Sequence, residues 1–463
     1  MRLIIIKNVK QSLKSLYQNF VPECVKVRFS ILFDPLPSNR IRANAATRVE
    51  NYFQACNKKL AKNNNGSSNN YYLHKAFKKH LVRSNLINEH WWSDFILLTN
   101  LPEGLKFQKM SQSLIDRIQN SNFNSLEYFE VLDIYALCLR FSLFELGYHL
   151  RQKSLQIAMN YSSSVKKNEN WKLKAKLSAL LETGNFSEFD QLFPLFKSRR
   201  KQERYFLIYL RRVLGNIKNS SVISLAPNID SKQDLKFSKF IENKKIVIVS
   251  PKLVDTKDGY KIDSADIVVR TNYKMGDSIN KGSRSDINYF NRETSQHIDE
   301  NGCFEWPSDI KWAVGKAWNY METILKRLSS DGINTEHLNA RTLKRIDSAL
   351  FYGSLLMLPN IITDLSRYNP KEIFLYHFDL LLSQDRIPGY FTDVNNNKEL
   401  HLKLIKNLSI HDPVINFMIL KLYWNQGFII GDYHFEEVMK MTTEDYMKNL
   451  QKNYRIDNSF GIS

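Results

Sequence analysis

Residues 245–272 read KIVIVSPKLVDTKDGYKIDSADIVVRTN and contain two β-branched runs separated by a polar segment rich in turn-forming residues. Each run is about as long as a short buried strand, and each ends on a polar side chain, Ser250 in the first case and Asn272 in the second. Continuous apolar runs are typical of parallel sheets that are covered on both faces. Because open α/β sheets bind ligands at the carboxyl ends of their strands, this stretch predicts both a fold class and the place of a site.

Further short β-branched or aromatic runs follow and alternate with helical patterns such as 348–368. The expected strands cover 244–250, 265–272, 285–291, 310–315 and 371–379. Strands that alternate with helices indicate a mostly parallel sheet with helices on both faces. We therefore expect an α/β domain with a Rossmann-like sheet over residues 240–463.

The first half of the chain has a helical pattern instead. Apolar residues recur at three- and four-residue spacing in 124–159, and 171–198 has the pattern of a helical hairpin that turns at Thr183-Gly184-Asn185. This TGNF turn resembles a helical repeat, but an array needs several copies. The composition shifts to Asn, Ser and Pro over 215–234. An all-α region over 1–225, repeat-like in pattern, is therefore expected before the α/β domain.

Composition limits the class of protein and its compartment. A hydrophobic content of 43% is ample for buried cores and argues against a disordered chain. The four cysteines are scattered, without the spacing of a zinc site or a disulfide framework. No apolar run approaches the roughly 18 residues needed to cross a bilayer. These features predict a cytoplasmic protein.

The formal net charge of +19 is unevenly distributed. Residues 1–80 contain fifteen lysine and arginine residues against three acidic residues. Such a segment could contact anionic lipid headgroups at the inner face of a membrane, an acidic glycan or nucleic acid. No nucleic-acid-binding signature accompanies the charge, which disfavours the last of these. A solvated basic surface would explain the same composition.

The common nucleotide and hydrolase motifs are missing from this chain. It contains no GxGxxG, no GxxxxGK[ST] and no GxSxG, which disfavours dinucleotide binding, P-loop chemistry and an α/β-hydrolase. No Asp-x-Asp pair occurs either, although many nucleotide-sugar transferases hold a divalent metal with one. We therefore expect chemistry that needs neither a metal nor a cofactor.

Residues 262–294, IDSADIVVRTNYKMGDSINKGSRSDINYFNRET, carry an ordered set of polar and apolar positions. They resemble the long sialylmotif of the eukaryotic-type sialyltransferase family, which runs Ile-Asp-Ser-x-Asp-x-Val-x-Arg-x-Asn, then Gly-Ser-[Arg/Lys], then an aromatic strand. The matching positions are Ile262, Asp263, Ser264, Asp266, Val268, Arg270, Asn272, Gly282, Ser283, Arg284, Tyr289 and Phe290. From the residues alone, Asp263 and Arg270 are expected to form a structural pair or to hold a turn, and a contact of Arg270 with the donor is the less favoured alternative.

Two further segments occur in the order that this family has. Around Gly353, a turn, a helix and the strand at 371–379 resemble the short sialylmotif, with His377 where the family has glycine. The segment 410–427, IHDPVINFMILKLYWNQG, resembles the histidine-bearing helix near the family's C-terminus. The resemblance covers roughly 244–432 and says nothing about the helical first half.

The resemblance implies a metal-independent, inverting transfer of sialic acid or a related nonulosonate from a CMP-sugar to a hydroxyl of a glycan or glycolipid acceptor. His411 would be the general base, since histidine titrates near neutral pH. Tyr390 would stabilise the leaving phosphate. The implied donor-binding residues are Ser250, Asn272, Asn291, Gly353 and Ser354.

Each of these residues also has an ordinary structural explanation. Asparagines that follow strands are commonly turn residues, which applies to Asn272 and Asn291. His411-Asp412-Pro413 also has the pattern of a plain helix start. Gly353 and Ser354 could be helix N-terminal residues, and Tyr390 is one of 22 tyrosines.

The chain departs from the family at several positions. Ser250-Pro251-Lys252 replaces the family's Gly-Asn-Ser, Phe351-Tyr352 stands where a serine pair is usual, and Asn416 replaces a frequent glutamate. The cysteines that tie the motifs together in secretory members are absent. These departures indicate a divergent, bacterial-like member. They also leave open a catalytically degenerate domain in a helical interaction protein, or a nucleic-acid- or membrane-binding module led by the basic N-terminus.

Overall fold

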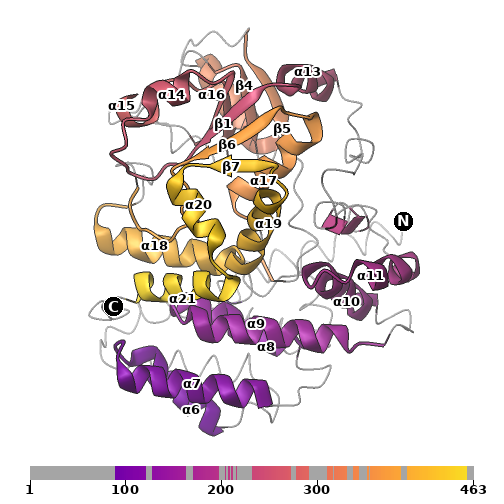
Figure 1. Cartoon of the computed structure of the whole chain (residues 1–463), viewed down its shortest axis with the longest axis vertical. Helices are drawn as coiled ribbons and strands as arrows, with labels where there is room; N and C mark the ends of the chain where they lie inside the picture. The colour runs from indigo at the N-terminus through magenta and orange to yellow at the C-terminus, as the bar shows by residue number, and fades with distance from the viewer. Residues whose placement is uncertain are drawn as a thin grey trace, which may run out of the picture.

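The computed structural model describes most of the chain between residues 89 and 455. Apart from a few single residues, such as Val49, the described ranges are 89–120, 128–162, 170–197, 232–272, 278–290, 310–315, 318–330, 337–343, 352–353, 355–386 and 394–455. The sheet and its helices lie at one end of the molecule, and the helices of the first half lie at the other (Figure 1).

The described strands form one parallel sheet of seven strands, in the order β5-β4-β3-β2-β1-β6-β7. They are β1 (Lys245–Val249), β2 (Ile267–Thr271), β3 (Ile287–Phe290), β4 (Trp312–Gly315), β5 (Asn339–Thr342), β6 (Glu372–Tyr376) and β7 (Ile429–Gly431). Every residue of β3 and β4 is buried, as expected for strands that are covered on both faces. The predicted α/β class is confirmed.

The strand order reverses between β1 and β6. From β1 the chain proceeds outward to β5 and then returns to pair β6 against the other side of β1, with Ile246 opposite Ile373. Such a reversal opens a crevice at the carboxyl ends of the two central strands, which is where open α/β sheets bind ligands. The segments that follow β1 and β6 are therefore the expected location of a ligand site.

The helices of this part flank the sheet and continue beyond it (Figure 1). They are α13 (Lys232–Ile241), α14 (Gly259–Asp263), α15 (Ser278–Lys281), α16 (Trp318–Ser330), α17 (Met357–Leu365), the 3-10 turn η6 (Ser366–Tyr368), α18 (Asn397–Ile410), α19 (Pro413–Asn425), α20 (Tyr433–Lys440) and α21 (Thr443–Tyr454). Several of them begin at a side chain that accepts a backbone N–H, such as Asp412 before α19 and Asp432 before α20. Asp432 also accepts the N–H of His377, the residue that directly follows β6.

The first half is helical where it is described. Its elements are α6 (Glu89–Asn100), α7 (Leu105–Asn120), α8 (Tyr128–Arg140), α9 (Phe144–Met159), α10 (Asn170–Glu182), α11 (Phe186–Leu192) and the 3-10 turn η2 (Phe193–Leu195). The predicted hairpin turn is confirmed, because Gly184 has φ of +73° and the Asn185 side chain caps α11. The pattern over 124–159 proves to be two helices, with Ser142 in a left-handed conformation between them.

Two strands of the sheet were not predicted, and one predicted helix begins later than expected. Neither β5 nor β7 was predicted, because NART is polar and IIG is too short to show a pattern. The helix expected over 348–368 begins at Met357, and the described residues 352–353 are not helical. The reason is tertiary, since the Leu356 N–H donates to the side chain of Asn416.

One continuous hydrophobic core includes residues of the first-half helices, the sheet and α17 to α21. At the junction, the Tyr135 ring of α8 lies 4.5 Å from the ring of Tyr352. Residues 216–231, in the expected boundary, lie outside the described residues, and so the division into domains at that point stays a prediction.

Candidate functional site

Four of the predicted site residues are described by the structure. Ser250 follows β1 and Asn272 follows β2, and both are buried. Gly353 lies before α17, and His411 lies between α18 and α19. The other three, Tyr390, Asn291 and Ser354, lie outside the described residues, and their roles stay predictions.

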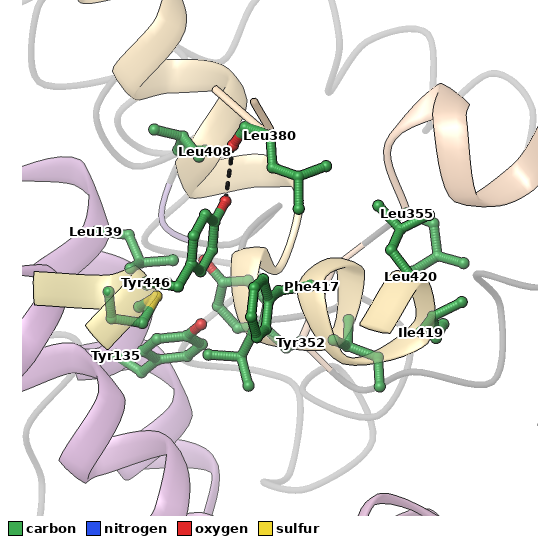
Figure 2. Packing of buried hydrophobic residues seen from close by; sticks show 14 of the residues in the cluster. Tyr135, Leu139, Tyr352, Leu355, Leu380, Leu408, Phe417, Ile419, Leu420 and Tyr446 are labelled. Carbon is green, nitrogen blue, oxygen red and sulfur yellow. Dashed lines mark hydrogen bonds between the residues drawn. The ribbon is translucent and has the colours of Figure 1, made fainter. Parts of the chain in front are cut away.

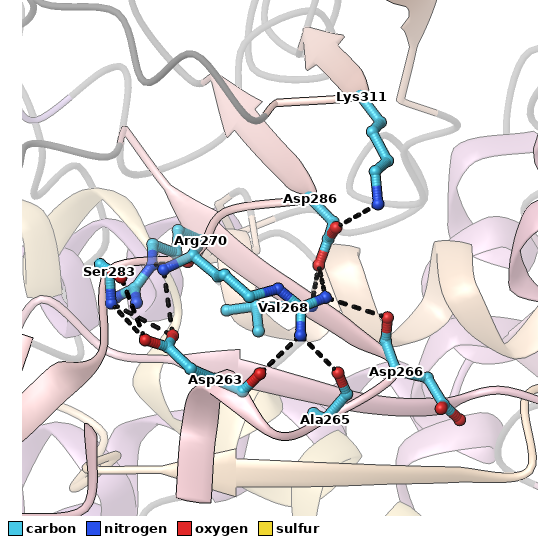
Figure 3. A network of polar contacts seen from close by, with 9 residues as sticks. Asp263, Ala265, Asp266, Val268, Arg270, Ser283, Asp286 and Lys311 are labelled. Carbon is cyan, nitrogen blue, oxygen red and sulfur yellow. Dashed lines mark hydrogen bonds and ion pairs between the residues drawn. The ribbon is translucent and has the colours of Figure 1, made fainter. Parts of the chain in front are cut away.

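The first part of the long-motif segment forms a tight turn around Asp263 (Figure 3). The Asp263 carboxylate accepts the backbone N–H of Ser283 at 2.8 Å and that of Arg284 at 3.0 Å. Gly282, between these partners and α15, has φ of +69°, and a side chain there would collide with the Asp263 carboxylate. Asp263 therefore holds this turn, as its sequence position predicted.

Arg270 and Arg284 complete the same turn with hydrogen bonds to the backbone. Arg270 donates from Nε to the Arg284 carbonyl and from Nη2 to the Lys281 carbonyl, each at 2.7 Å. Arg284 donates to the carbonyls of Asp263 and Ala265 and pairs with Asp286 at 2.7 Å. The turn-holding role expected for Arg270 is thus confirmed.

Asn272 ends β2 in a left-handed conformation, with φ of +46°. Its N–H donates to the carbonyl of Tyr289 at 3.0 Å, which extends the pairing with β3 by one residue. Asparagine adopts this conformation more readily than most residues, and so the turn alone accounts for its presence. A contact between its amide and a donor stays a prediction.

The short-motif turn and the histidine segment lie directly against each other. The Tyr352 hydroxyl donates to the Ser409 carbonyl at 2.6 Å, and the Leu356 N–H donates to Asn416 Oδ1 at 2.8 Å. Gly353 packs on the backbone at Ile410, where any side chain would overlap the carbonyl oxygen. The structure thus brings Gly353 beside the turn that carries His411.

Replacing Gly353 with alanine should therefore destabilise the protein by about 1–3 kcal/mol, because the added methyl group meets a backbone carbonyl that cannot rotate away. The midpoint of urea unfolding measures this loss. A Gly353→Ala variant as stable as the unmodified chain would contradict the close packing at Ile410.

Figure 2 shows Leu408 and Phe417, which lie on either side of the histidine turn, in one buried cluster with Leu380 and Tyr446. The Phe417 ring, in the second turn of α19, stacks on Tyr446 at 4.7 Å. The Tyr446 hydroxyl in turn donates to the Leu380 carbonyl at 2.7 Å, four residues beyond the end of β6. His411 itself is half-buried, and its N–H donates to the Asn407 carbonyl and ends α18.

Asp412, next to the predicted base, is fully buried and receives donors from the first-half helices. The Tyr135 hydroxyl and Arg151 Nε donate to its two carboxylate oxygens, each at 2.9 Å. Arg151 also pairs with Glu182 at 2.7 Å. Burial by itself would lower the pKa of the Arg151 guanidinium, but the two carboxylates outweigh it and raise that pKa. This buried network was missed at the sequence level.

A cleft of about 540 Å³ opens beside the crevice between β1 and β6. It is lined by the turn after β1, the loop after β6, α20 and α21, through Lys252, Asp379, Leu382, Ser383, Gln384, Tyr433, His434, Glu437, Val438 and Asn453. Lys252 and Asp379 pair across it at 2.9 Å. Its volume lies within the range of small-molecule sites, and its lining supplies amides, carboxylates and an exposed tyrosine.

His377 ends β6 in a left-handed conformation, with φ of +65°, and is fully buried. Its N–H donates to Asp432 Oδ2 at 2.6 Å, and its Nδ1 lies 3.3 Å from the same oxygen. Burial would raise the pKa of Asp432, but the hydrogen bonds from His377 and Phe435 lower it. Asp432 is therefore held as a carboxylate between β6 and α20.

Lys281 is buried at the carboxyl end of β1, with 3% of its surface exposed. Its Nζ donates to the Ser250 carbonyl at 2.6 Å. Burial first, and then the neighbouring cations Arg270, Arg386 and Lys252, lower its pKa to about 7. In the sequence this lysine has the pattern of a surface turn, and so nothing local indicated its burial.

The chain was compared with known proteins, and no protein-family model, curated protein or solved structure matches it. Within the described ranges, none of the helices has the length and apolar character to cross a bilayer. The same ranges contain no group of three or more His, Cys, Asp or Glu side chains placed to hold a metal ion.

Proposed function

We propose that this chain is a sialyltransferase-type glycosyltransferase with a Rossmann-like sheet. It would move sialic acid or a related nonulosonate from a CMP-sugar to a hydroxyl of a glycan or glycolipid, with inversion and without a metal. One observation supports this above the others: Ser250 and Asn272, the Gly353 turn and the His411 turn, far apart in the sequence, all lie on the carboxyl side of one parallel sheet, after β1 and β2 and before α17 and α19. Sites of such sheets form there.

The proposed chemistry needs few groups. His411 would accept the proton of the acceptor hydroxyl as it attacks the anomeric carbon. The bond from that carbon to the CMP phosphate would break, and hydrogen-bond donors, Tyr390 among them, would stabilise the departing phosphate. Asn272 and Asn291 would contact the cytosine, because an amide both donates and accepts.

Backbone conformation gives independent support to the resemblance. His377 stands where the family has glycine, and its φ of +65° is one that glycine adopts most readily. Gly282, which matches the glycine of Gly-Ser-[Arg/Lys], has φ of +69°. Both positions thus have the conformation that a glycine in the family's motif would serve.

The purified chain incubated with CMP-sialic acid, glycan acceptors and EDTA tests the proposal. We expect CMP release that depends on the acceptor and is undiminished by EDTA. A UDP-linked N-acetyl sugar serves as the control donor and should not turn over. If CMP-sialic acid is neither bound nor turned over, the proposal is wrong.

The second candidate is a catalytically degenerate domain in a helical interaction protein. One observation favours it: Lys252, in the altered Ser250-Pro251-Lys252 turn, pairs with Asp379 across the cleft. Thermal-shift measurements that show no response to CMP or CTP would support this candidate. Residues 1–80, apart from Val49, lie outside the described residues. Contact of this segment with the inner face of a membrane is therefore a separate proposal, tested by co-sedimentation with anionic liposomes.

A further inference from the structure

Basic side chains from three separate segments surround the carboxyl end of β1. Lys281 comes from α15, Lys252 from the turn after β1, and Arg386 from the loop after β6. Both lysines contact Ser250, since Lys281 Nζ donates to its carbonyl at 2.6 Å and the Lys252 N–H donates to its hydroxyl at 3.2 Å. Lys281 and Lys252 therefore meet at the reversal of strand order, beside the cleft that Lys252 lines, and Arg386 donates to the carbonyl of Ser383, which lines the same cleft.

Among the residues that the structure describes, positive charges outnumber negative ones at this point. Asp379 pairs with Lys252, and the cations of Lys252 and Arg386 lower its pKa against the effect of burial. Among the described residues, the charged groups that lower the pKa of Lys281 are the cations Arg270, Arg386 and Lys252. A buried ammonium among like charges is unfavourable unless an anion accompanies it. An ammonium also has three N–H donors, and the Ser250 carbonyl accepts from one of them.

We propose that Lys281, Lys252 and Arg386 form a binding site for an oxyanion of the phosphate class at the carboxyl end of β1. The naming of that anion as the phosphate of a CMP-sugar rests on the proposed function, whereas the site itself rests on the geometry of these side chains. The proposal also accounts for the departure at residues 250–252. Where the family has Gly-Asn-Ser, this chain introduces Lys252, which would bind phosphate through charge instead of through small polar donors.

Sulfate binding to the full-length chain tests the site, because sulfate remains a dianion from pH 6 to 9 while the lysine titrates. An anion binds the protonated lysine better, and in the free protein that proton is lost as pH rises through about 7. At constant ionic strength, sulfate affinity should therefore fall on the order of tenfold between pH 6 and 8.5, by isothermal titration calorimetry. Affinity that does not change with pH would overturn the proposal.

Two variants and one control test whether Lys281 and Arg386 are responsible for sulfate binding. Lys281→Met should weaken sulfate binding at pH 6 on the order of tenfold and remove its pH dependence. Lys261→Met is the matched control, since Lys261 lies on the neighbouring α14, is exposed and pairs with Asp258, the residue before that helix. Because Lys281 is buried, thermal unfolding should accompany each measurement, and Arg386→Gln provides a second test nearer the surface. If Lys281→Met and Arg386→Gln both bind sulfate as the unmodified chain does, the site does not exist.

Competition separates this site from the proposed function. CMP should displace sulfate and cytidine should not, which would identify the anion as a nucleotide phosphate. Sulfate binding through Lys281 that CMP does not displace would support an anion site and contradict a CMP-sugar donor. Conversely, undiminished transfer from CMP-sialic acid by Lys281→Met and Arg386→Gln would overturn the naming of this anion as the donor phosphate and leave the transferase standing.

Discussion

Replacing Arg151 with methionine should lower the free energy of unfolding by about 3–5 kcal/mol, because the change leaves buried carboxylates without their counter-charge. Arg151 pairs with Asp412 at 2.9 Å and with Glu182 at 2.7 Å, and none of the three side chains is more than 6% exposed. Asp412 also caps α19, and so the loss should extend to the start of that helix. Chemical unfolding of Arg151→Met, followed by circular dichroism, measures the effect.

Arg211→Met is the matched control for this experiment. Arg211 and Asp190 form an ion pair in the same helical region at 2.7 Å, but their side chains are 27% and 55% exposed. An exposed pair contributes about 0–1 kcal/mol, since water screens it and its side chains lose conformational freedom. Equal costs for the two variants would contradict the stabilisation assigned to the buried Arg151 network.

The sheet could be predicted from the sequence only where strands are apolar. IVIV, in β1, and IVV, in β2, are β-branched and buried, and their alternation with helices indicated the parallel sheet. The strand NART pairs in the same sheet through its backbone, yet its side chains carry no strand pattern. The start of α17 was also misplaced, because contacts with the histidine segment hold the preceding turn out of the helix.

The expected location of the candidate site could be predicted from the sequence, but the buried contacts around it could not. Polar residues after apolar strands indicated the carboxyl edge, since that rule depends only on local order along the chain. The Arg151–Asp412 contact joins residues 261 positions apart, and no local pattern encodes it. Lys281 was missed for a related reason: a lysine in a polar turn is expected in solvent, and only the tertiary fold brings its side chain to the Ser250 carbonyl and buries it.

These contacts suggest why the helical first half accompanies the α/β part. Tyr135 on α8 and Arg151 on α9 meet the turn that carries His411, and α8 packs its Tyr135 ring on Tyr352 of the short-motif turn. Helices that hydrogen-bond to such a turn reduce its conformational freedom and so hold its side chains in one orientation. The first half therefore acts as a support for the candidate catalytic edge, whatever further partners it has.

Replacing His411 with alanine should lower the rate of sialyl transfer about 10²–10⁴-fold while leaving CMP affinity unchanged, because the variant removes the proposed general base and no donor contact. His149→Ala is the control, since His149 lies on α9 and is outside the candidate site. Initial rates with saturating CMP-sialic acid measure the loss, and CMP titration calorimetry measures the affinity.

Added imidazole distinguishes a missing base from a displaced turn. A small base can enter the space that the side chain leaves and restore part of the rate, whereas a disordered turn would not respond to it. We therefore expect partial rescue of His411→Ala and no effect of imidazole on His149→Ala. Full transfer by His411→Ala would place the base on another residue while leaving the donor assignments at Ser250 and Asn272 intact.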